Sequence, residues 1–68
     1  MQVGSRVQVN ESLPYVKTAD PMPMLRSGNL LPLGSQGVIV GQRPGGYWVV
    51  QFAGGVFLVD PRYLQPIQ

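Results

Sequence analysis

Apolar residues in this chain alternate with polar ones or form short runs bounded by glycine, a pattern typical of β-strands. The clearest alternation covers Ser5–Asn10, where Val7 and Val9 are separated by polar side chains. Further strands are predicted at 37–42, 47–52 and 56–60, with a short last strand at 64–67. Nine glycines and seven prolines among 68 residues leave few windows for two helical turns. The sequence therefore predicts an all-β fold.

Three short segments are predicted to be turns. Arg43–Gly46 has proline second and glycine third, which favours a type II turn. A second hairpin turn is predicted at 53–55, where glycine readily adopts positive φ. Pro61–Tyr63 is predicted to be one 3-10 turn, capped by Asp60. The strands at 37–42, 47–52 and 56–60 would then form a meander.

The segment Glu11–Gln36 contains four prolines and is predicted to be a long irregular loop. The resulting order is a strand, the loop, a three-stranded meander, a 3-10 turn and a last strand. This order favours a small five-stranded SH3-like barrel that forms a single domain over residues 1–68. An OB-type barrel is the alternative, but it would need longer strands and usually a helix.

The two strands at 47–52 and 56–60 are apolar on both faces, although a small barrel has only one interior. Trp48, Val50 and Phe52 are predicted to point inward, which leaves Tyr47 and Val49 outside. Two explanations remain open. The long loop can fold over the outer face with its leucines, methionines and tyrosine, or part of this surface can stay free for a partner.

The chain lacks the side chains on which most catalytic and metal sites depend. It has no histidine and no cysteine, and its carboxylates are Glu11, Asp20 and Asp60 only. The glycine pairs at 45–46 and 54–55 lie between predicted strands and open no helix, so they do not form a phosphate-binding loop. We expect no enzyme activity, no metal and no cofactor.

Charge and targeting signals narrow the partner further. The net charge is +2, and the five basic residues are scattered singly, which argues against nucleic acid as a ligand. The N-terminus lacks a basic region followed by an apolar core, and no apolar run approaches the roughly 20 residues of a membrane helix. The absence of cysteine favours the cytosol. We therefore expect a cytoplasmic protein that binds another protein without membrane insertion.

Candidate partner-binding residues come from the proline-containing loop and from the ends of the meander. Methionines adapt to irregular surfaces, and arginines beside tyrosines are enriched at interface hot spots. The predicted set is Tyr15, Lys17, Met22, Met24, Arg26, Arg43, Tyr47 and Arg62.

The sequence also resembles a known family in four places: Pro14–Arg26, Gly37-Val38, Arg43–Trp48 and Tyr63-Leu64. In these stretches it is similar to the cyanobacterial SipA family, small adaptors of two-component signalling. The resemblance implies an SH3-like fold. It also implies a sensor histidine kinase of the NblS type as partner, bound at its ATP-binding domain and stimulated in autophosphorylation during high-light and nutrient stress. A response regulator is a further implied partner.

Two other functions are compatible with the sequence. One is an RNA- or ribosome-associated barrel, which the positive charge would suit. The other is a small peripheral subunit of a photosynthetic or redox complex. No residue of the sequence decides between these alternatives and the kinase regulator.

Overall fold

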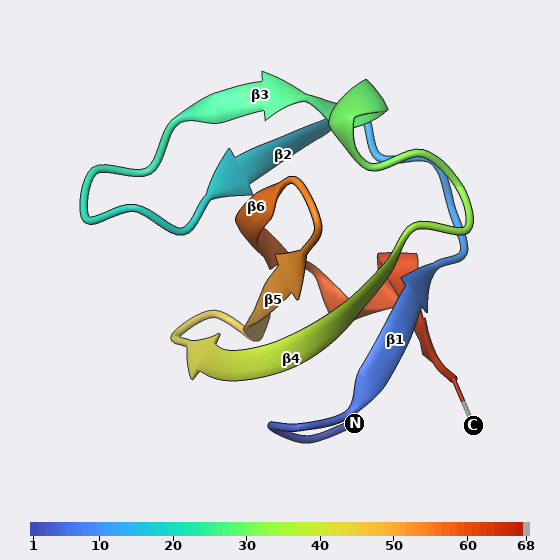
Figure 1. Ribbon diagram of the computed structural model, residues 1–68. Helices are drawn as coiled ribbons and strands as arrows, with labels where there is room; N and C mark the ends of the chain where they lie inside the picture. Colours follow the sequence, from blue (N-terminus) through green and yellow to red (C-terminus); the bar gives the residue numbers. More distant parts are fainter. Residues whose placement is uncertain (68) are drawn as a thin grey trace.

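The computed structural model describes residues 1–67 as one antiparallel sheet with two short 3-10 helices (Figure 1). The last residue of the predicted domain, Gln68, lies outside the described part. The strand order across the sheet is β3-β2-β6-β5-β4-β1-β7. The elements are β1 (Arg6–Val9), β2 (Tyr15–Thr18), β3 (Leu25–Ser27), η1 (Gly28–Leu30), β4 (Gln36–Arg43), β5 (Tyr47–Phe52), β6 (Gly55–Val59), η2 (Pro61–Tyr63) and β7 (Leu64–Pro66).

The all-β class and the meander are confirmed. β5 and η2 have the predicted bounds, and β1, β4, β6 and β7 lie within one or two residues of theirs. Asp60 caps η2 as expected, because its Oδ1 accepts a hydrogen bond from the Arg62 N–H at 3.0 Å. Gly45 and Gly46 both adopt positive φ in the β4–β5 turn, which explains the glycine pair there.

The prediction of five strands was wrong, because Glu11–Gln36 is not an irregular loop. It contains β2, β3 and η1, so the sheet has seven strands. The prolines that suggested a loop all lie outside these elements: Pro14 precedes β2, Pro21 and Pro23 occupy the β2–β3 turn, and Pro32 follows η1. Between them, the sequence Tyr-Val-Lys-Thr of β2 has high β-propensity.

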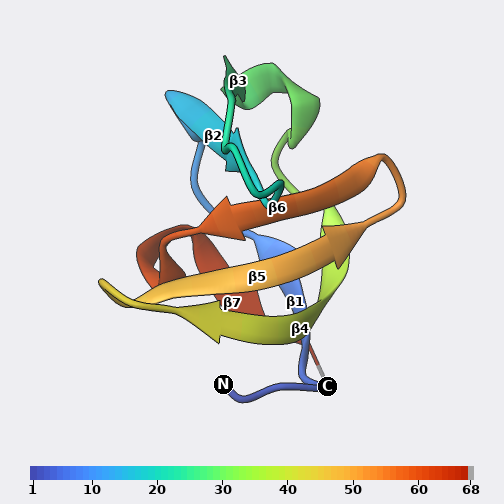
Figure 2. The same ribbon diagram turned by 90° about the vertical axis from the view of Figure 1, so that its left-hand side faces the viewer.

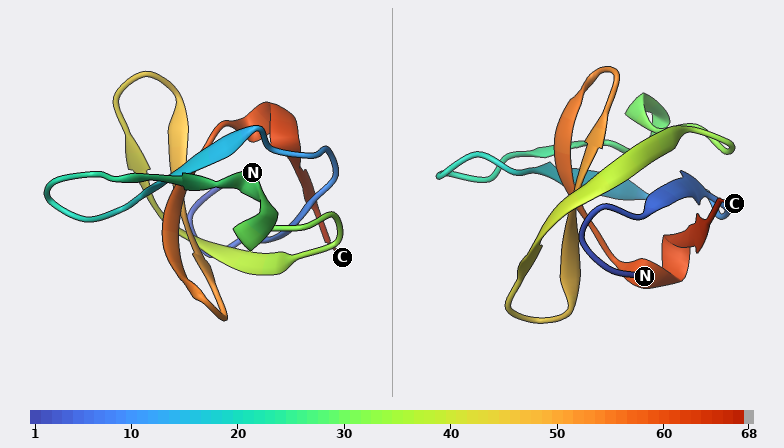
Figure 3. Two further views of the ribbon diagram at one scale, coloured as in Figure 1. Left: turned by 90° about the horizontal axis from the view of Figure 1, so that it is seen from above. Right: turned by 60° about the horizontal axis from the view of Figure 1, so that its bottom comes forward.

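The β2–β3 hairpin is closed by hydrogen bonds at the start of its turn, where it is also bonded to β6. The Thr18 N–H donates to the Met24 carbonyl at 2.9 Å, and the Met24 N–H donates to the Thr18 hydroxyl at 3.0 Å. The Ala19 N–H donates to the Val56 carbonyl at 3.1 Å, which continues the pairing of β2 with β6. The turn between β2 and β3 protrudes from the rest of the molecule (Figures 1 and 3).

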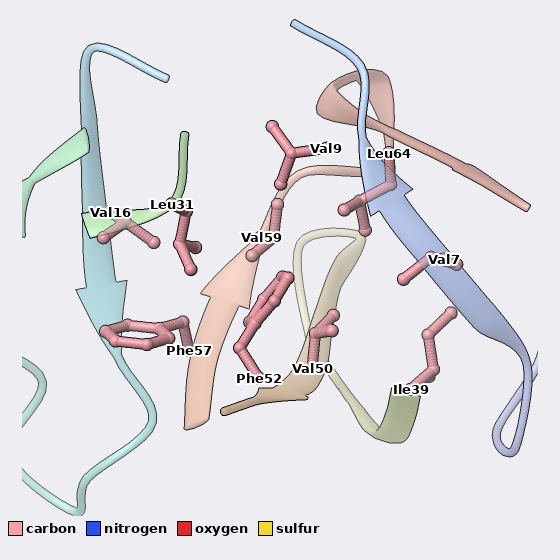
Figure 4. Packing of buried hydrophobic residues seen from close by; sticks show 10 residues of the cluster. All are labelled: Val7, Val9, Val16, Leu31, Ile39, Val50, Phe52, Phe57, Val59 and Leu64. Carbon is pink, nitrogen blue, oxygen red and sulfur yellow. The ribbon is translucent and has the colours of Figure 1, made fainter. Parts of the chain in front are cut away.

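The sheet coils around one apolar core, and Figure 2 shows β4, β5 and β6 curving across it. β3 and β7 lie at the two ends of the strand order and are not paired with each other, so the sheet is not closed. The core side chains come from both ends of the sheet and point toward one another (Figure 4). They are Val7, Val9, Val16, Leu31, Ile39, Val50, Phe52, Phe57, Val59 and Leu64.

Two glycines allow close backbone approach. A Cβ at Gly28 would overlap the backbone carbonyl of Leu13, where η1 packs under the chain that leads into β2. A Cβ at Gly37 would lie 2.7 Å from the Gln51 carbonyl oxygen, where β4 crosses β5. Neither position has room for a side chain.

The inward orientation of the β5 face is confirmed. Val50 and Phe52 are buried, and Trp48 is half-buried and packs against the margin of the core. The segment 11–36 contributes Val16 and Leu31 to the core, but it leaves most of its other large apolar side chains exposed. Those exposed are Tyr15, Met22, Met24, Leu25, Leu30 and Leu33. The segment therefore adds two side chains to the core and leaves the others in solvent, and a partner for this exposed surface stays a prediction.

Candidate protein-interaction surface

The outer face of the sheet carries two cross-strand rows that meet the β2–β3 hairpin. Lys17 pairs with Leu58, which pairs with Val49, which pairs with Gly41. In the neighbouring row, Tyr47 pairs with Arg43 on β4. Outward positions of an antiparallel sheet are usually polar. Here Val49 is buried and Leu58 is half-buried, so this part of the outer face is apolar beneath its polar rim.

A hollow of about 130 Å³ lies at the edge of this patch, with Leu58 among its lining residues. Tyrosines from three elements line it: Tyr15 from β2, Tyr47 from β5 and Tyr63 from η2. We call it the tyrosine hollow. Its other lining residues are Leu13, Pro14, Val16, Lys17, Leu58, Asp60 and Arg62. It therefore combines an apolar floor, three phenols and both signs of charge.

Lys17 lies across the hollow. Its Nζ is 6.0 Å from the centre of the Tyr47 ring, although Lys17 is on β2 and Tyr47 is on β5. β6 lies between these strands, and its Leu58 is the direct partner of Lys17. The aliphatic stem of Lys17 must therefore pass over Leu58 to bring the ammonium group to the ring. Such a stem covers apolar surface while its charge stays in water.

Asp60 and Arg62 fix the opposite rim. The Asp60 carboxylate caps η2 through one oxygen, while its Oδ2 lies 3.4 Å from the Arg62 Nε. The Arg62 guanidinium lies 5.7 Å from the centre of the Tyr63 ring. Both cations of the hollow are thus held beside an aromatic face, an arrangement that is weakly attractive at exposed sites.

The structure brings together half of the predicted binding residues. Tyr15, Lys17, Tyr47 and Arg62 all line the tyrosine hollow, although they are up to 47 positions apart in the sequence. The remaining four lie elsewhere. Met22 is in the β2–β3 turn and Met24 just before β3, Arg26 is on β3 beside a shallow hollow with Leu30 and Phe57, and Arg43 ends β4.

Sequence reasoning missed six of the ten lining residues, which are Leu13, Pro14, Val16, Leu58, Asp60 and Tyr63. The signal for Leu58 was its apolar character at an outward position of β6, which alternates with the buried Phe57 and Val59. Asp60 was assigned a capping role only, which is correct but incomplete, because its second oxygen faces Arg62. Pro14 gave no signal beyond its effect on the backbone.

A second apolar feature extends along the hairpin. Met22 is 83% exposed and Leu25 is 63% exposed, and Met24 lies between them with more than half of its surface in solvent. Leu25 pairs with Lys17 and so shares the outer face with the tyrosine hollow. The hollow and the exposed hairpin residues therefore form neighbouring parts of one surface.

We also searched residues 1–67 for a metal-binding cluster and for a membrane-spanning helix. No group of three or more carboxylate, histidine or cysteine side chains gathers there at metal-binding distance. Within the same residues, no helix is long and apolar enough to cross a bilayer.

Comparison with known proteins points to one family. The profile of the family described as "CRR42-like: Protein CHLORORESPIRATORY REDUCTION 42-like" matches residues 3–64. Among curated proteins, the chain is 35% identical over 69 aligned positions to "Protein CHLORORESPIRATORY REDUCTION 42, chloroplastic" from Arabidopsis thaliana. The alignment covers 100% of this chain and 57% of the relative, so the chain spans just over half of that protein's length. No solved structure matches the chain.

These matches overturn the resemblance to the SipA family. The stretches that carried it occupy the β2–β3 hairpin, the start of β4, the β4–β5 turn and the junction of η2 with β7. Turns between antiparallel strands favour proline and glycine for conformational reasons, whatever the family. Similarity at these positions therefore did not discriminate between families.

The functional predictions drawn from that resemblance are therefore wrong as well. A sensor histidine kinase or response regulator as partner, stimulation of autophosphorylation and a role in two-component signalling all conflict with the family that matches. The predicted cytoplasmic location is also wrong, because the curated relative is chloroplastic. The alternative of a peripheral subunit of a photosynthetic complex agrees better with these findings. With a profile match over residues 3–64, the chain belongs to the CRR42-like family.

Proposed function

We propose that this protein is a non-catalytic, protein-binding component that serves chlororespiratory electron transfer as a peripheral part of a larger complex. The observation that carries the proposal is the exposed apolar surface of the β2–β3 hairpin and the outer sheet face. Exposed apolar patches on small domains mark interaction sites. Tyrosine, methionine and arginine, which are enriched in interface cores, are all present on this surface.

The side-chain chemistry supports a binding role over a catalytic one. The whole sequence has no histidine or cysteine to serve as base or nucleophile. Its three carboxylates are dispersed: Glu11 follows β1, Asp20 lies in the β2–β3 turn, and Asp60 caps η2. Over residues 1–67, they form no group that could hold a metal ion.

The strand order supports an SH3-like arrangement as the finer description of the fold. β7, β1, β4, β5 and β6 are consecutive neighbours, the β2–β3 hairpin is inserted after β1, and η2 precedes the last strand. In this arrangement the inserted hairpin continues the sheet beyond β6, and the tyrosine hollow lies where the two parts join.

The process and location come from the relative. Its name places it in the chloroplast and connects it with chlororespiratory reduction. We extend this connection to the present chain because the family match spans every element from β1 to η2.

The proposal is tested in the organism that encodes the chain. A tagged copy is expected to co-migrate with a chlororespiratory complex on native gels of solubilised membranes. Deletion of the gene is expected to lower the dark reduction of the electron-carrier pool, followed as the chlorophyll-fluorescence rise after illumination. A tagged protein that migrates as a free monomer, together with unchanged dark reduction in the deletion strain, would refute the proposal.

A further inference from the structure

The size of the tyrosine hollow limits what it can hold. Sites for cofactors and other small molecules usually enclose about 300–1,000 Å³. The hollow measures about 130 Å³, close to the roughly 150 Å³ of an engineered cavity that holds one benzene ring. It therefore has room for a single side chain and not for a nucleotide or a flavin. A partner that places one side chain here must present it from an extended or exposed segment.

The side chains that line the hollow can form hydrogen bonds with a polypeptide backbone. Tyr15, Tyr47 and Tyr63 each offer an apolar ring together with a hydroxyl that donates and accepts hydrogen bonds. Tyrosines supply contact area with few torsions to immobilise on binding. The ring contacts of Lys17 and Arg62 also hold both cations close to the hollow before any partner arrives.

The charge around the hollow is unbalanced. Arg62 is paired with Asp60, whose other oxygen is occupied by the η2 cap. Over residues 1–67, no carboxylate lies within 4.0 Å of the Lys17 ammonium. The hollow therefore presents one uncompensated positive charge at its edge. Complementarity at an interface favours an opposite charge at that point.

Resting on the proposed function, we propose that the tyrosine hollow binds an acidic, extended segment of the partner protein. One apolar side chain of the segment enters the hollow above Leu58, and a neighbouring carboxylate pairs with Lys17. The hollow thereby selects a short sequence in which an apolar residue is flanked by aspartate or glutamate. The exposed methionines of the hairpin add contact area beside it.

The test uses the full 68-residue chain, labelled with ¹⁵N, and three ten-residue peptides with one central leucine. The flanking residues are glutamates in the first peptide, glutamines in the second and lysines in the third. The acidic peptide is expected to shift the amide signals of Tyr15, Lys17, Tyr47 and Tyr63 at millimolar concentration. Its affinity should fall as salt rises from 0.05 to 0.5 M.

Two charge-removing variants separate a specific contact from general attraction. Lys17→Gln is expected to weaken binding of the acidic peptide about three- to fivefold, the range for a partly exposed ion pair. Arg6→Gln removes the same charge from β1, outside the hollow, and is expected to change the affinity less than twofold. Equal effects of the two variants would contradict the proposal.

Other outcomes would also overturn it. These are equal binding of the acidic and neutral peptides, shifts confined to the hairpin turn or to other surfaces, and no shift with any peptide. The proposed function has a separate readout, since it requires only co-migration with the complex. If the wild-type protein co-migrates but the peptide test fails, the partner binds elsewhere on the chain and only the assignment of the hollow is wrong.

Discussion

The five main strands β1, β4, β5, β6 and β7 and the β2–β3 hairpin belong to one sheet, yet they bury their side chains very differently. The main strands contain Val7, Ile39 and Val50, which have no exposed surface. The hairpin strands contribute Val16 to the core, whereas all three residues of β3 are exposed. The main strands therefore supply most of the core, and the hairpin leaves most of its side chains in solvent. Substitutions in the two regions should separate stability from binding.

The largest effect is expected in the five main strands. Ile39→Ala removes three buried carbons from the centre of the core and should lower the free energy of unfolding by about 2–5 kcal/mol. For a domain of this size, such a loss approaches the whole stability. Urea denaturation followed by Trp48 fluorescence measures it. The neighbouring Val40 is a matched control, since it lies on the β4 bulge with nearly half its surface exposed. Val40→Ala should change stability by less than about 0.5 kcal/mol.

The next effect concerns the junction between the two regions. Gly28→Ala places a methyl group against the Leu13 carbonyl and should destabilise the protein by about 1–3 kcal/mol. Gly54→Ala is the control, because a Cβ there meets no atom within 4 Å and the residue has no positive φ. The melting temperatures of both variants, compared with that of the wild type, measure this difference in stability. A Gly28→Ala protein that melts with the wild type would show that η1 can shift away from Leu13.

A smaller effect is expected where the hairpin meets the core. Val16→Ala removes two buried methyl groups and should lower the free energy of unfolding by about 1.6 kcal/mol. Native-state hydrogen exchange adds a second measurement. In this variant the Thr18 and Met24 amides, which close the hairpin, should exchange faster by a larger factor than amides in β4 and β5. Equal acceleration everywhere would show that the hairpin and the five main strands unfold as one unit.

The smallest effect on stability is expected at the hairpin tip. A substitution there should instead weaken binding. Met22→Ser alters a side chain that is 83% exposed and should change stability by less than about 0.5 kcal/mol. Co-migration with the complex should nevertheless weaken, because an apolar interface contact is lost. Val3→Ser, which alters an exposed apolar side chain far from the hairpin in sequence, serves as the control. Unchanged co-migration of the Met22 variant would remove the hairpin tip from the interface.

The strands of the meander could be predicted because local pattern and burial agree there. Phe52 and Val50 alternate with Gln51 along β5, and the flanking turns carry their own glycines. β2 and β3 could not be predicted, because their signal is four and three residues long and is surrounded by prolines. β3 also has no buried side chain, so its alternation carries no information about burial. Its pairing depends on β2.

The sequence predicted which types of residue would form the candidate binding surface, but not which of them lie close together. Tyr15 and Tyr47 were recognisable as interface-type residues, yet only the pairing of β2 with β6 brings them to one hollow. Such pairings between distant segments are set by tertiary packing, and single-sequence patterns do not encode them. The family assignment failed for a related reason, because the stretches compared were rich in turn residues.

The two ends of the strand order have a consequence for solubility. At one end, β7 finishes with Pro66, which has no N–H to donate to an incoming strand. At the other end, β3 is three residues long, carries Arg26 and follows a turn containing Pro21 and Pro23. Edge strands that are short, charged or contain proline disfavour edge-to-edge pairing with the sheet of another molecule. The two edge strands therefore disfavour polymerisation of a chain whose sheet face exposes much apolar surface.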